Sequence, residues 1–280
     1  MTIGDIIHDK LPGKASQKKL TFLDSDVLLE FVTNQPREYL YSYPEKELTA
    51  AEEKHFLNLR QRRLAGEPIA YLTGTKEFYD LDFIVNKDVL IPRPDTELLV
   101  DAVLNYLTDT KAQKSMIADI GTGSGNIAIA VKKNYPNCNM IATDVSKTAL
   151  AVAKKNASNN KVKIKFYPGD VLAALPTSLL NSLDVICFNA PYLTKTEAKK
   201  HNLAHEPQVA LTPTGEPTEL IERLLVNAEK YLTTDGIIFL EIGHLQADQV
   251  TKLCYKYFPA AQVSITQDLG NFDRLITCKI

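Results

Sequence analysis

The sequence predicts an α/β fold in which a doubly wound, mostly parallel sheet follows a small N-terminal helical domain. From about residue 115 onward, short apolar strand patterns alternate with helical patterns, the order that builds a parallel sheet with crossover helices. Residues 1 to about 75 show helical spacing of apolar side chains and no convincing strand. The length of 280 residues leaves room for two domains.

The expected helical domain, residues 1–75, contains two clear helical patterns. The first spans Ser25–Thr33. Its apolar face is expected to consist of Val27, Leu28, Phe31 and Val32. The second begins at the capping-box sequence Thr49–Glu52 and runs to Gly66, a natural C-cap. Its buried stripe is expected to consist of Phe56, Leu59 and Leu64.

After the helical domain, the spacing of apolar residues changes from a helical period to the alternation of a strand. Glu77–Val85 alternates enough to predict a β-hairpin, and we expect residues 76–92 to link the helical domain to a larger domain, residues 93–280. Ile91–Asp95 forms a rigid turn because its two prolines fix the backbone. Asp95 is placed to cap the helix that follows.

Seven strands are expected in the larger domain. They are Ser115–Asp119, Asn139–Asp144, Lys161–Phe166, Leu183–Phe188, Gly236–Glu241, Gln262–Thr266 and Arg274–Lys279. Helical patterns, including Lys147–Asn156 and Glu219–Tyr231, separate the earlier strands. The last two strands are joined without room for a crossover helix, so they should pair antiparallel.

A glycine-rich segment lies between the first strand and its helix. It comprises Gly121, Thr122, Gly123, Ser124 and Gly125. The glycines let the backbone turn sharply and approach a ligand closely, and the helix N-terminus behind them favours a negative group such as a carboxylate. The pattern is GxGxG and differs from the dinucleotide pattern GxGxxG. The same residues would also suit a tight strand–helix turn that binds nothing.

Acidic residues follow the next two strands. Asp144 lies about twenty residues past the loop, where an acid can hold both hydroxyls of a ribose. It could instead cap the next helix, although Ser146 can serve as that cap. Asp170 and Val171 could meet the amino group and the ring of an adenine, or could belong to an ordinary Gly-Asp turn.

The segment Asn189-Ala190-Pro191-Tyr192 follows the fourth strand. Pro191 cannot donate to a sheet ladder, so the strand must end there, at the edge where open α/β sheets bind ligands. The Asn189 side chain and a nearby carbonyl can accept both hydrogens of a planar –NH2 group, and the Tyr192 ring can stack on its plane. This equipment would hold an amide or an amine while its nitrogen attacks an electrophile.

Bulk properties exclude several classes of protein. The net charge of −2 argues against non-specific nucleic-acid binding, and the four cysteines lack CxxC spacing, which suits a reducing compartment and gives no zinc pattern. His201 and His205 near Glu206 are too weak a pattern to indicate a metal. No signal peptide and no apolar run near the ~20 residues of a membrane span are visible. We therefore expect a cytoplasmic monomer without metal, membrane or stable nucleic-acid partners.

Along nearly its whole length the chain resembles the protein-glutamine N5-methyltransferases of peptide chain release factors, the HemK or PrmC family. The segments that carry the resemblance are Gly66–Gly74, Phe78, Leu90–Glu97, Gly121–Gly125, Glu206–Pro207 with Ala210–Leu211, Leu240–Gly243, and Asp268–Asn271 with Arg274. The resemblance implies a Rossmann-like class I S-adenosylmethionine-dependent methyltransferase fold, with an antiparallel last strand in a seven-stranded sheet. Because residues 1–75 carry no cofactor signal of their own, we expect the N-terminal domain to recognise the substrate.

The implied activity is methyl transfer from S-adenosylmethionine to the glutamine amide of the GGQ motif in release factors, which would be the protein partners. Gly121–Gly125 would hold the methionine end, Asp144 the ribose, and Asp170 with Val171 the adenine. Asn189, also expected to bind the cofactor, and the Ala190 carbonyl would accept the amide hydrogens. With Pro191 and Tyr192, whose ring would pack on the amide plane, these residues form the expected catalytic and substrate-binding set.

Two residues depart from the family pattern: Ala190, and Val171, where larger or aromatic residues are common. The family usually has Asn-Pro-Pro-Tyr, and this chain has Ala190 at the first proline. Alanine keeps the carbonyl but restores an N–H and a freer φ. The alternatives are a glutamine methyltransferase of ribosomal proteins, an adenine-N6 nucleic-acid methyltransferase, and a cofactor-binding protein without catalysis. The sequence also leaves open whether Glu206 shapes the acceptor pocket or caps a loop.

Overall fold

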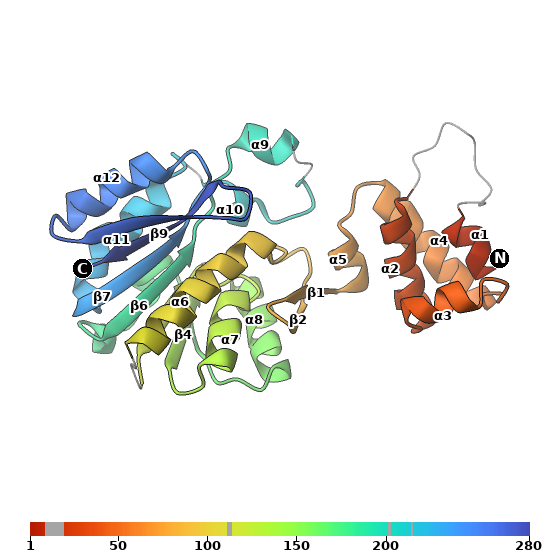
Figure 1. Cartoon of the computed structure of the whole chain (residues 1–280), viewed down its shortest axis with the longest axis horizontal. Coiled ribbons are helices and arrows are strands. Elements are labelled where there is room, and N and C mark those ends of the chain that lie inside the picture. Colours follow the sequence, from red (N-terminus) through yellow and green to blue (C-terminus); the bar gives the residue numbers. More distant parts are fainter. Residues whose placement is uncertain (9–19, 111–113, 201–202, 214) are drawn as a thin grey trace. The chain divides into compact units, whose positions relative to one another are not determined.

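The computed structural model describes residues 1–8, 20–110, 114–200, 203–213 and 215–280. His201, one of the two histidines considered for a metal, lies outside them. The chain divides into two compact units, Met1–Thr75 and Lys76–Ile280, whose elements are labelled in Figure 1. Within the described ranges, no helix combines the length and the apolar character needed to cross a membrane.

The described part of the first unit is helical. Its helices are α1 (Ile3–Ile7), α2 (Phe22–Thr33), α3 (Arg37–Ser42), α4 (Ala50–Leu64) and α5 (Ile69–Thr73). Helix α4 begins at the predicted capping box, in which the Thr49 side chain accepts from the Glu52 N–H and the Glu52 side chain accepts from the Thr49 N–H. Phe56 and Leu59 of α4 are buried as expected, whereas Leu64, in its last turn, is half-buried.

The predicted apolar face of α2 is partly wrong. Phe31 is 42% exposed, and the buried face contains Leu28 and Leu29 together with polar residues. Asp26 is one of them, and its carboxylate is held by the Arg37 guanidinium at 2.7 Å. Apolar spacing alone misplaces this face because a paired carboxylate takes a position that a hydrophobic residue would normally fill.

The second unit is built on a seven-stranded sheet of order β5-β4-β3-β6-β7-β9-β8. The strands are β3 (Met116–Ile120), β4 (Asn139–Asp144), β5 (Lys165–Pro168), β6 (Leu183–Asn189), β7 (Leu232–Glu241), β8 (Gln262–Gln267) and β9 (Asp273–Lys279). The pairs from β5 to β7 are parallel, and β9 is antiparallel to both β7 and β8, which confirms the predicted last strand.

Helices cover both faces of this sheet (Figure 1). On one face lie α6 (Glu97–Asp109), α7 (Asn126–Asn134) and α8 (Lys147–Asn159), and on the other α11 (Glu219–Tyr231) and α12 (Ala247–Tyr257). The shorter elements are η1 (Pro94–Thr96), η2 (Val171–Ala174), η3 (Thr177–Leu179), α9 (Lys195–Lys200) and α10 (Gln208–Leu211). Helix α11 packs through Ile221, Leu224, Leu225 and Ala228, the i, i+3, i+4, i+7 spacing of an amphipathic helix.

Three local predictions need correction. The third strand, expected at Lys161–Phe166, is β5 (Lys165–Pro168), because α8 runs on to Asn159 and Lys161 then turns in the left-handed region at φ 59°. The fifth strand starts at Leu232 instead of Gly236. Asp95 does not cap α6, because η1 precedes that helix, and its carboxylate lies 3.4 Å from Arg274.

The predicted hairpin is present as β1 (Thr75–Phe78) and β2 (Leu81–Ile84). Tyr79 and Asp80 at its tip both have positive φ, which is the requirement of a tight two-residue hairpin turn. The amide of Asn156 on α8 fastens β2: its Oδ1 accepts from the Ile84 N–H at 2.7 Å, and its Nδ2 donates to the Ile84 carbonyl at 3.0 Å. The role of residues 76–92 as a linker stays a prediction.

Candidate functional site

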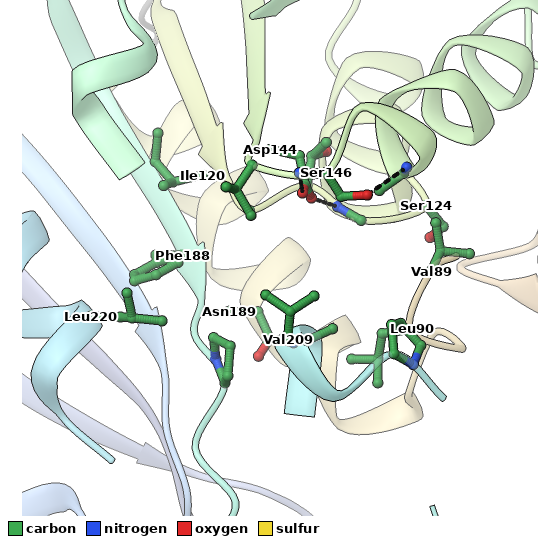
Figure 2. Close-up of a pocket in the computed structure, with 18 of the residues that line it drawn as sticks. Val89, Leu90, Ile120, Ser124, Asp144, Ser146, Phe188, Asn189, Val209 and Leu220 are labelled. Carbon is green, nitrogen blue, oxygen red and sulfur yellow. Dashed lines mark hydrogen bonds between the residues drawn. The ribbon is translucent and has the colours of Figure 1, made fainter. Parts of the chain in front are cut away.

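The carboxyl ends of β3, β4 and β6 surround a cavity of about 550 Å³, a size typical of small-molecule sites. In Figure 2, Asp144 and Ser146 lie across the cavity from Asn189 and Leu220. Apolar side chains, including Ile120, Val145, Phe188 and Leu220, form much of its wall. The cavity therefore offers polar groups at two places and apolar surface between them.

The predicted glycine-rich loop lines this cavity and leads into α7. Gly121, Gly123 and Gly125 all have positive φ, between 55° and 84°. A Cβ on Gly125 would approach Ile129 at 3.0 Å and Ala153 at 3.2 Å, whereas a Cβ on Gly123 would meet nothing within 4 Å. Gly123 is thus required by its backbone conformation alone, and its Cα faces open space that a ligand can use.

Asp144, which was predicted to hold a ribose, is oriented by two backbone N–H groups. Its Oδ2 accepts from the Gly123 N–H at 2.9 Å, and its Oδ1 accepts from the Ser146 N–H at 2.8 Å. Ser146 caps α8 as predicted, since its Oγ accepts from the Ala149 N–H at 3.1 Å. Burial raises the pKa of Asp144, and the two N–H groups oppose that rise. Each carboxylate oxygen keeps further capacity to accept a hydroxyl.

Asp119, two residues before the glycine segment, is a buried acid to which the sequence reasoning assigned no role. Its Oδ2 accepts from the Thr122 hydroxyl at 2.6 Å and from the Ala128 N–H at 3.2 Å, so it ties the loop to α7. Burial raises its pKa to about 7, the Thr122 and Ala128 hydrogen bonds oppose the rise, and the charge of Asp144 adds to it. An acid two residues before the first glycine of the turn was the available signal.

Asp170 and Val171 both line the cavity. The Asp170 carboxylate is paired with Arg223 of α11, so it is oriented by a residue that lies 53 positions away in the chain. Val171 has φ 47°, a left-handed conformation that β-branched residues rarely adopt. Such strained backbone is concentrated at ligand-binding segments of proteins.

The segment after β6 reaches the cavity with two of its four residues. Asn189 and Pro191 line the cavity, whereas Ala190 is 1% exposed. Tyr192 is half-buried beside the cavity and packs against Gly243, where a Cβ would lie 3.3 Å from the Tyr192 Cδ2. Burial raises the pKa of Tyr192 to about 12, so its hydroxyl stays protonated at neutral pH.

Two further side chains surround Asn189, and neither was predicted as a site residue. The Asn189 Nδ2 donates to the Thr96 Oγ1 at 3.2 Å, and Asn189 lies in register with Glu241 on the adjacent strand β7. Burial raises the pKa of Glu241 to about 7; Thr96, Arg274 and Asn189 oppose the rise, and Asp95 adds to it. Thr96 and Glu241 occur in two of the segments that carry the family resemblance, which was the only signal for them.

Glu206 is a buried carboxylate that fastens the segment before η1. Its Oε2 accepts from the Ile91 N–H at 3.1 Å, and its Oε1 binds the Arg93 guanidinium. Arg93 also lines the cavity. Glu206 thus fixes one wall of the site, an answer that the sequence left open. His205 is exposed, and among the described residues no group of three or more acidic, histidine or cysteine side chains could hold a metal ion.

Two family models match the chain. Residues 95–218 match the methyltransferase small domain, and residues 16–74 match the PrmC N-terminal domain. Solved structures with related folds include a 16S rRNA methyltransferase of T. thermophilus (TM-score 0.52, 15% identity, 73% of this chain and 49% of that one). Another is a methyltransferase of Pyrococcus furiosus (TM-score 0.50, 16% identity, 79% and 98%). At these identities they support the fold alone.

Curated relatives extend over almost the whole chain. A release factor glutamine methyltransferase of Coxiella burnetii is 36% identical over 258 residues, which cover 92% of this chain and 91% of the relative. The corresponding protein of Koribacter versatilis is 35% identical, covering 91% and 89%. A bifunctional methyltransferase of Rickettsia prowazekii is 38% identical, but the match spans about half (52%) of its length. The chain belongs to the release factor glutamine methyltransferase family.

Proposed function

We propose that this protein transfers a methyl group from S-adenosylmethionine to the side-chain amide nitrogen of the GGQ glutamine in peptide chain release factors. The observation that supports it most is that Asn189, the glycine-rich loop and Asp144 all line one cavity. An –NH2 acceptor held by Asn189 would then lie beside a cofactor held by the loop and Asp144. The relatives that are named for this activity cover about nine tenths of the chain.

The residues of the cavity fit S-adenosylmethionine. The loop at the N-terminus of α7 suits the methionine carboxylate, and its open Gly123 lets the ligand approach the backbone. Asp144 can accept both ribose hydroxyls, and Val171 with Asp170 lies where the adenine would be held. When bound, the cofactor supplies a methyl group on a positively charged sulfur, an electrophile for the acceptor nitrogen.

The protein's part in the reaction is to orient the acceptor. An amide nitrogen is a poor nucleophile because its lone pair is delocalised. The Asn189 Oδ1 and the Ala190 carbonyl would accept its two hydrogens and direct the lone pair, an effect of orientation worth up to ~7–11 kcal/mol. These acceptors also favour the positive charge that develops on the nitrogen, which afterwards releases a proton to solvent. The protonated Tyr192 would pack on the amide plane without acting as a base.

Radiolabelled S-adenosylmethionine tests the activity directly. We expect label on a purified release factor, and none on the same factor with its GGQ glutamine changed to alanine. Label on a ribosomal protein or on DNA in place of the release factor would select one of the alternative acceptors. A protein that binds the cofactor and labels no acceptor would contradict methyl transfer altogether.

The match of residues 16–74 to the PrmC N-terminal domain supports a role for residues 1–75 in substrate recognition. The larger unit has its own core and its own cavity, so a chain of residues 76–280 should still bind S-adenosylmethionine. It should not methylate the release factor. Normal methylation by the truncated chain would exclude this role.

A further inference from the structure

We propose that Glu241 and Thr96 are positioning residues that hold the Asn189 amide with its oxygen turned toward the acceptor nitrogen. This role rests on the proposed methyl transfer, whose geometry needs that oxygen as an acceptor. Nothing in the sequence patterns assigned a role to either residue. Both lie outside the Asn189–Tyr192 segment, on β7 and η1, and meet Asn189 in space.

Glu241 is a buried acid at an unusual place. It is the last residue of β7, stands in register with Asn189 at the end of β6, and is 1% exposed. Neither of its carboxylate oxygens has a hydrogen bond of normal geometry among the described residues. An unpaired buried carboxylate costs several kcal/mol of stability, so packing alone gives no reason for an acid here.

Thr96 connects this acid to the Asn189 amide. It is 2% exposed, and its Oγ1 accepts from the Asn189 Nδ2 at 3.2 Å. A hydroxyl has one proton to donate, and that proton remains available for Glu241. The side chains of Thr96 and Asn189 both lower the pKa of Glu241 and so favour its charged form.

The ionised carboxylate decides which way the amide turns. The two ends of an asparagine amide have nearly the same shape, and a threonine hydroxyl can either donate or accept, so Thr96 alone selects neither orientation. A carboxylate only accepts. It therefore draws the Thr96 proton and leaves the Thr96 oxygen to accept from Nδ2, while the second Nδ2 hydrogen also gains from facing the negative charge. The Asn189 Oδ1 is left for the substrate.

The rotated amide would be unproductive. It would set the Asn189 oxygen against Glu241 and point two N–H donors at the –NH2 group of the substrate. When Glu241 is protonated, its own hydrogen can satisfy the oxygen of a rotated Asn189, so the preference is lost. Among the described residues, the other charged or titratable groups that act on Glu241 or on its neighbours are Arg274, Asp95, Tyr192, Arg93 and Asp268.

Four variants separate a positioning role from a structural one. Glu241→Gln and Thr96→Val remove the charge and the hydroxyl with little change of shape, and Thr96→Ser restores the hydroxyl. Glu229→Gln makes the same charge change at an exposed position of α11 and serves as the matched control. Methyl transfer to a release factor, S-adenosylmethionine binding and thermal unfolding are measured for each, with the pH dependence of kcat for the wild type and Glu241→Gln.

Glu241→Gln and Thr96→Val should lower kcat by about 100-fold, the effect of a misoriented group in an active site, with cofactor Kd changed less than about twofold. Thr96→Ser should recover most of the rate that Thr96→Val loses. The thermal midpoint of Glu241→Gln should stay unchanged or rise, because a buried charge is removed. Wild-type kcat should increase through about pH 7, and Glu241→Gln should lack that increase. Wild-type kcat in Glu241→Gln would overturn the proposal, as would an equal loss in Thr96→Ser and Thr96→Val.

An NMR titration of the Asn189 side-chain amide keeps this test separate from the identity of the acceptor. In the wild type its two Nδ2 proton signals should shift with an apparent pKa near that of Glu241, and in Glu241→Gln they should not. If the Asn189 Nδ2 signals of the wild type do not shift with pH, the positioning role is overturned even if release factors are methylated. Signals that titrate without methylation of a release factor support the positioning and contradict only the proposed substrate.

Discussion

The two ends of the cavity are organised by different parts of the chain. At the loop after β3, Asp144 is held by two backbone N–H groups, and the conformation depends on glycines with positive φ. At the acceptor end, Asn189 is held by the Thr96 hydroxyl and lies in register with Glu241, whose carboxylate has no regular hydrogen bond to any residue that the structure describes. Main-chain N–H groups therefore orient Asp144 at the cofactor end, whereas a side-chain hydroxyl orients Asn189 at the acceptor end. Substitutions at the acceptor end should therefore lower kcat, and substitutions at the cofactor end should weaken cofactor binding.

The largest effect is expected at the acceptor end. Asn189→Ala removes the acceptor for one amide hydrogen, and we expect a loss in kcat of about 100- to 1,000-fold, the size seen when one oriented polar group is removed from an active site. Cofactor Kd should change much less. Asn105→Ala, at an exposed position of α6, is the control. Steady-state kinetics with a release factor measure the effect, and a normal kcat would remove Asn189 from the mechanism.

Asp144→Asn should show the opposite pattern. It removes the charge that would hold the ribose, and charge-assisted hydrogen bonds of this kind contribute about 1.5–3 kcal/mol. The expected result is a cofactor Kd weaker by about 10- to 100-fold, with kcat at saturating cofactor within a few-fold of the wild type. Titration calorimetry measures Kd. A large fall in kcat with an unchanged cofactor Kd would contradict the proposed difference between the two ends.

Each end of the cavity has one buried acid that should make stability depend on pH, Asp119 at the cofactor end and Glu241 at the acceptor end. Burial raises the pKa of Asp119 and of Glu241 to about 7, from ordinary values of 3.8 and 4.5. Between those values and pH 7 the folded protein binds protons that the unfolded chain has released. The free energy of unfolding should therefore fall as pH rises from about 4 to 7, by about 3–4 kcal/mol for each acid.

Urea unfolding at about pH 5 and pH 8 measures this fall. Glu241→Gln should remove the part of this fall that Glu241 causes and keep the part that Asp119 causes. The free energy of unfolding of this variant should therefore depend less on pH than that of the wild type. Glu229→Gln should behave like the wild type. Equal slopes in all three proteins would show that Glu241 carries no raised pKa in the folded state.

The smallest effect is expected for Ala190→Pro. Asn189 ends a strand, and an extended residue is what a following proline requires, so the change should be tolerated. Proline would stiffen the turn by about 0.4–1 kcal/mol, which corresponds to at most about a fivefold change in kcat. A much larger gain would show that the native turn is poorly organised. A large loss would show that the restored N–H or the freer φ is needed.

Sequence patterns predicted elements whose ends carry clear signals. Asn139–Asp144 and Glu219–Tyr231 have the predicted bounds, because an apolar core stretch ends at a polar residue in each. The third strand was misplaced because Lys161–Lys165 alternates polar and apolar residues as a strand does, yet α8 runs to Asn159 and β5 begins only at Lys165.

The site was predictable only where neighbouring residues act together. The glycine-rich loop, Asp144 and the Asn189 segment could be expected at one sheet edge because each follows a parallel strand. The contact between Asn189 and Thr96 joins residues 93 positions apart, and no local pattern specifies it. The same holds for the pairing of Asp170 with Arg223.

The place of β9 inside the sheet has a consequence for synthesis. Strand β8 precedes β9 in the chain, yet β9 is the strand that lies between β7 and β8. While the ribosome is still making residues 273–279, β7 lacks its antiparallel neighbour and β8 cannot join the sheet. Arg274, which acts on Glu241, arrives with the same strand. The nascent protein should therefore complete its glycine-rich loop first and its acceptor end last.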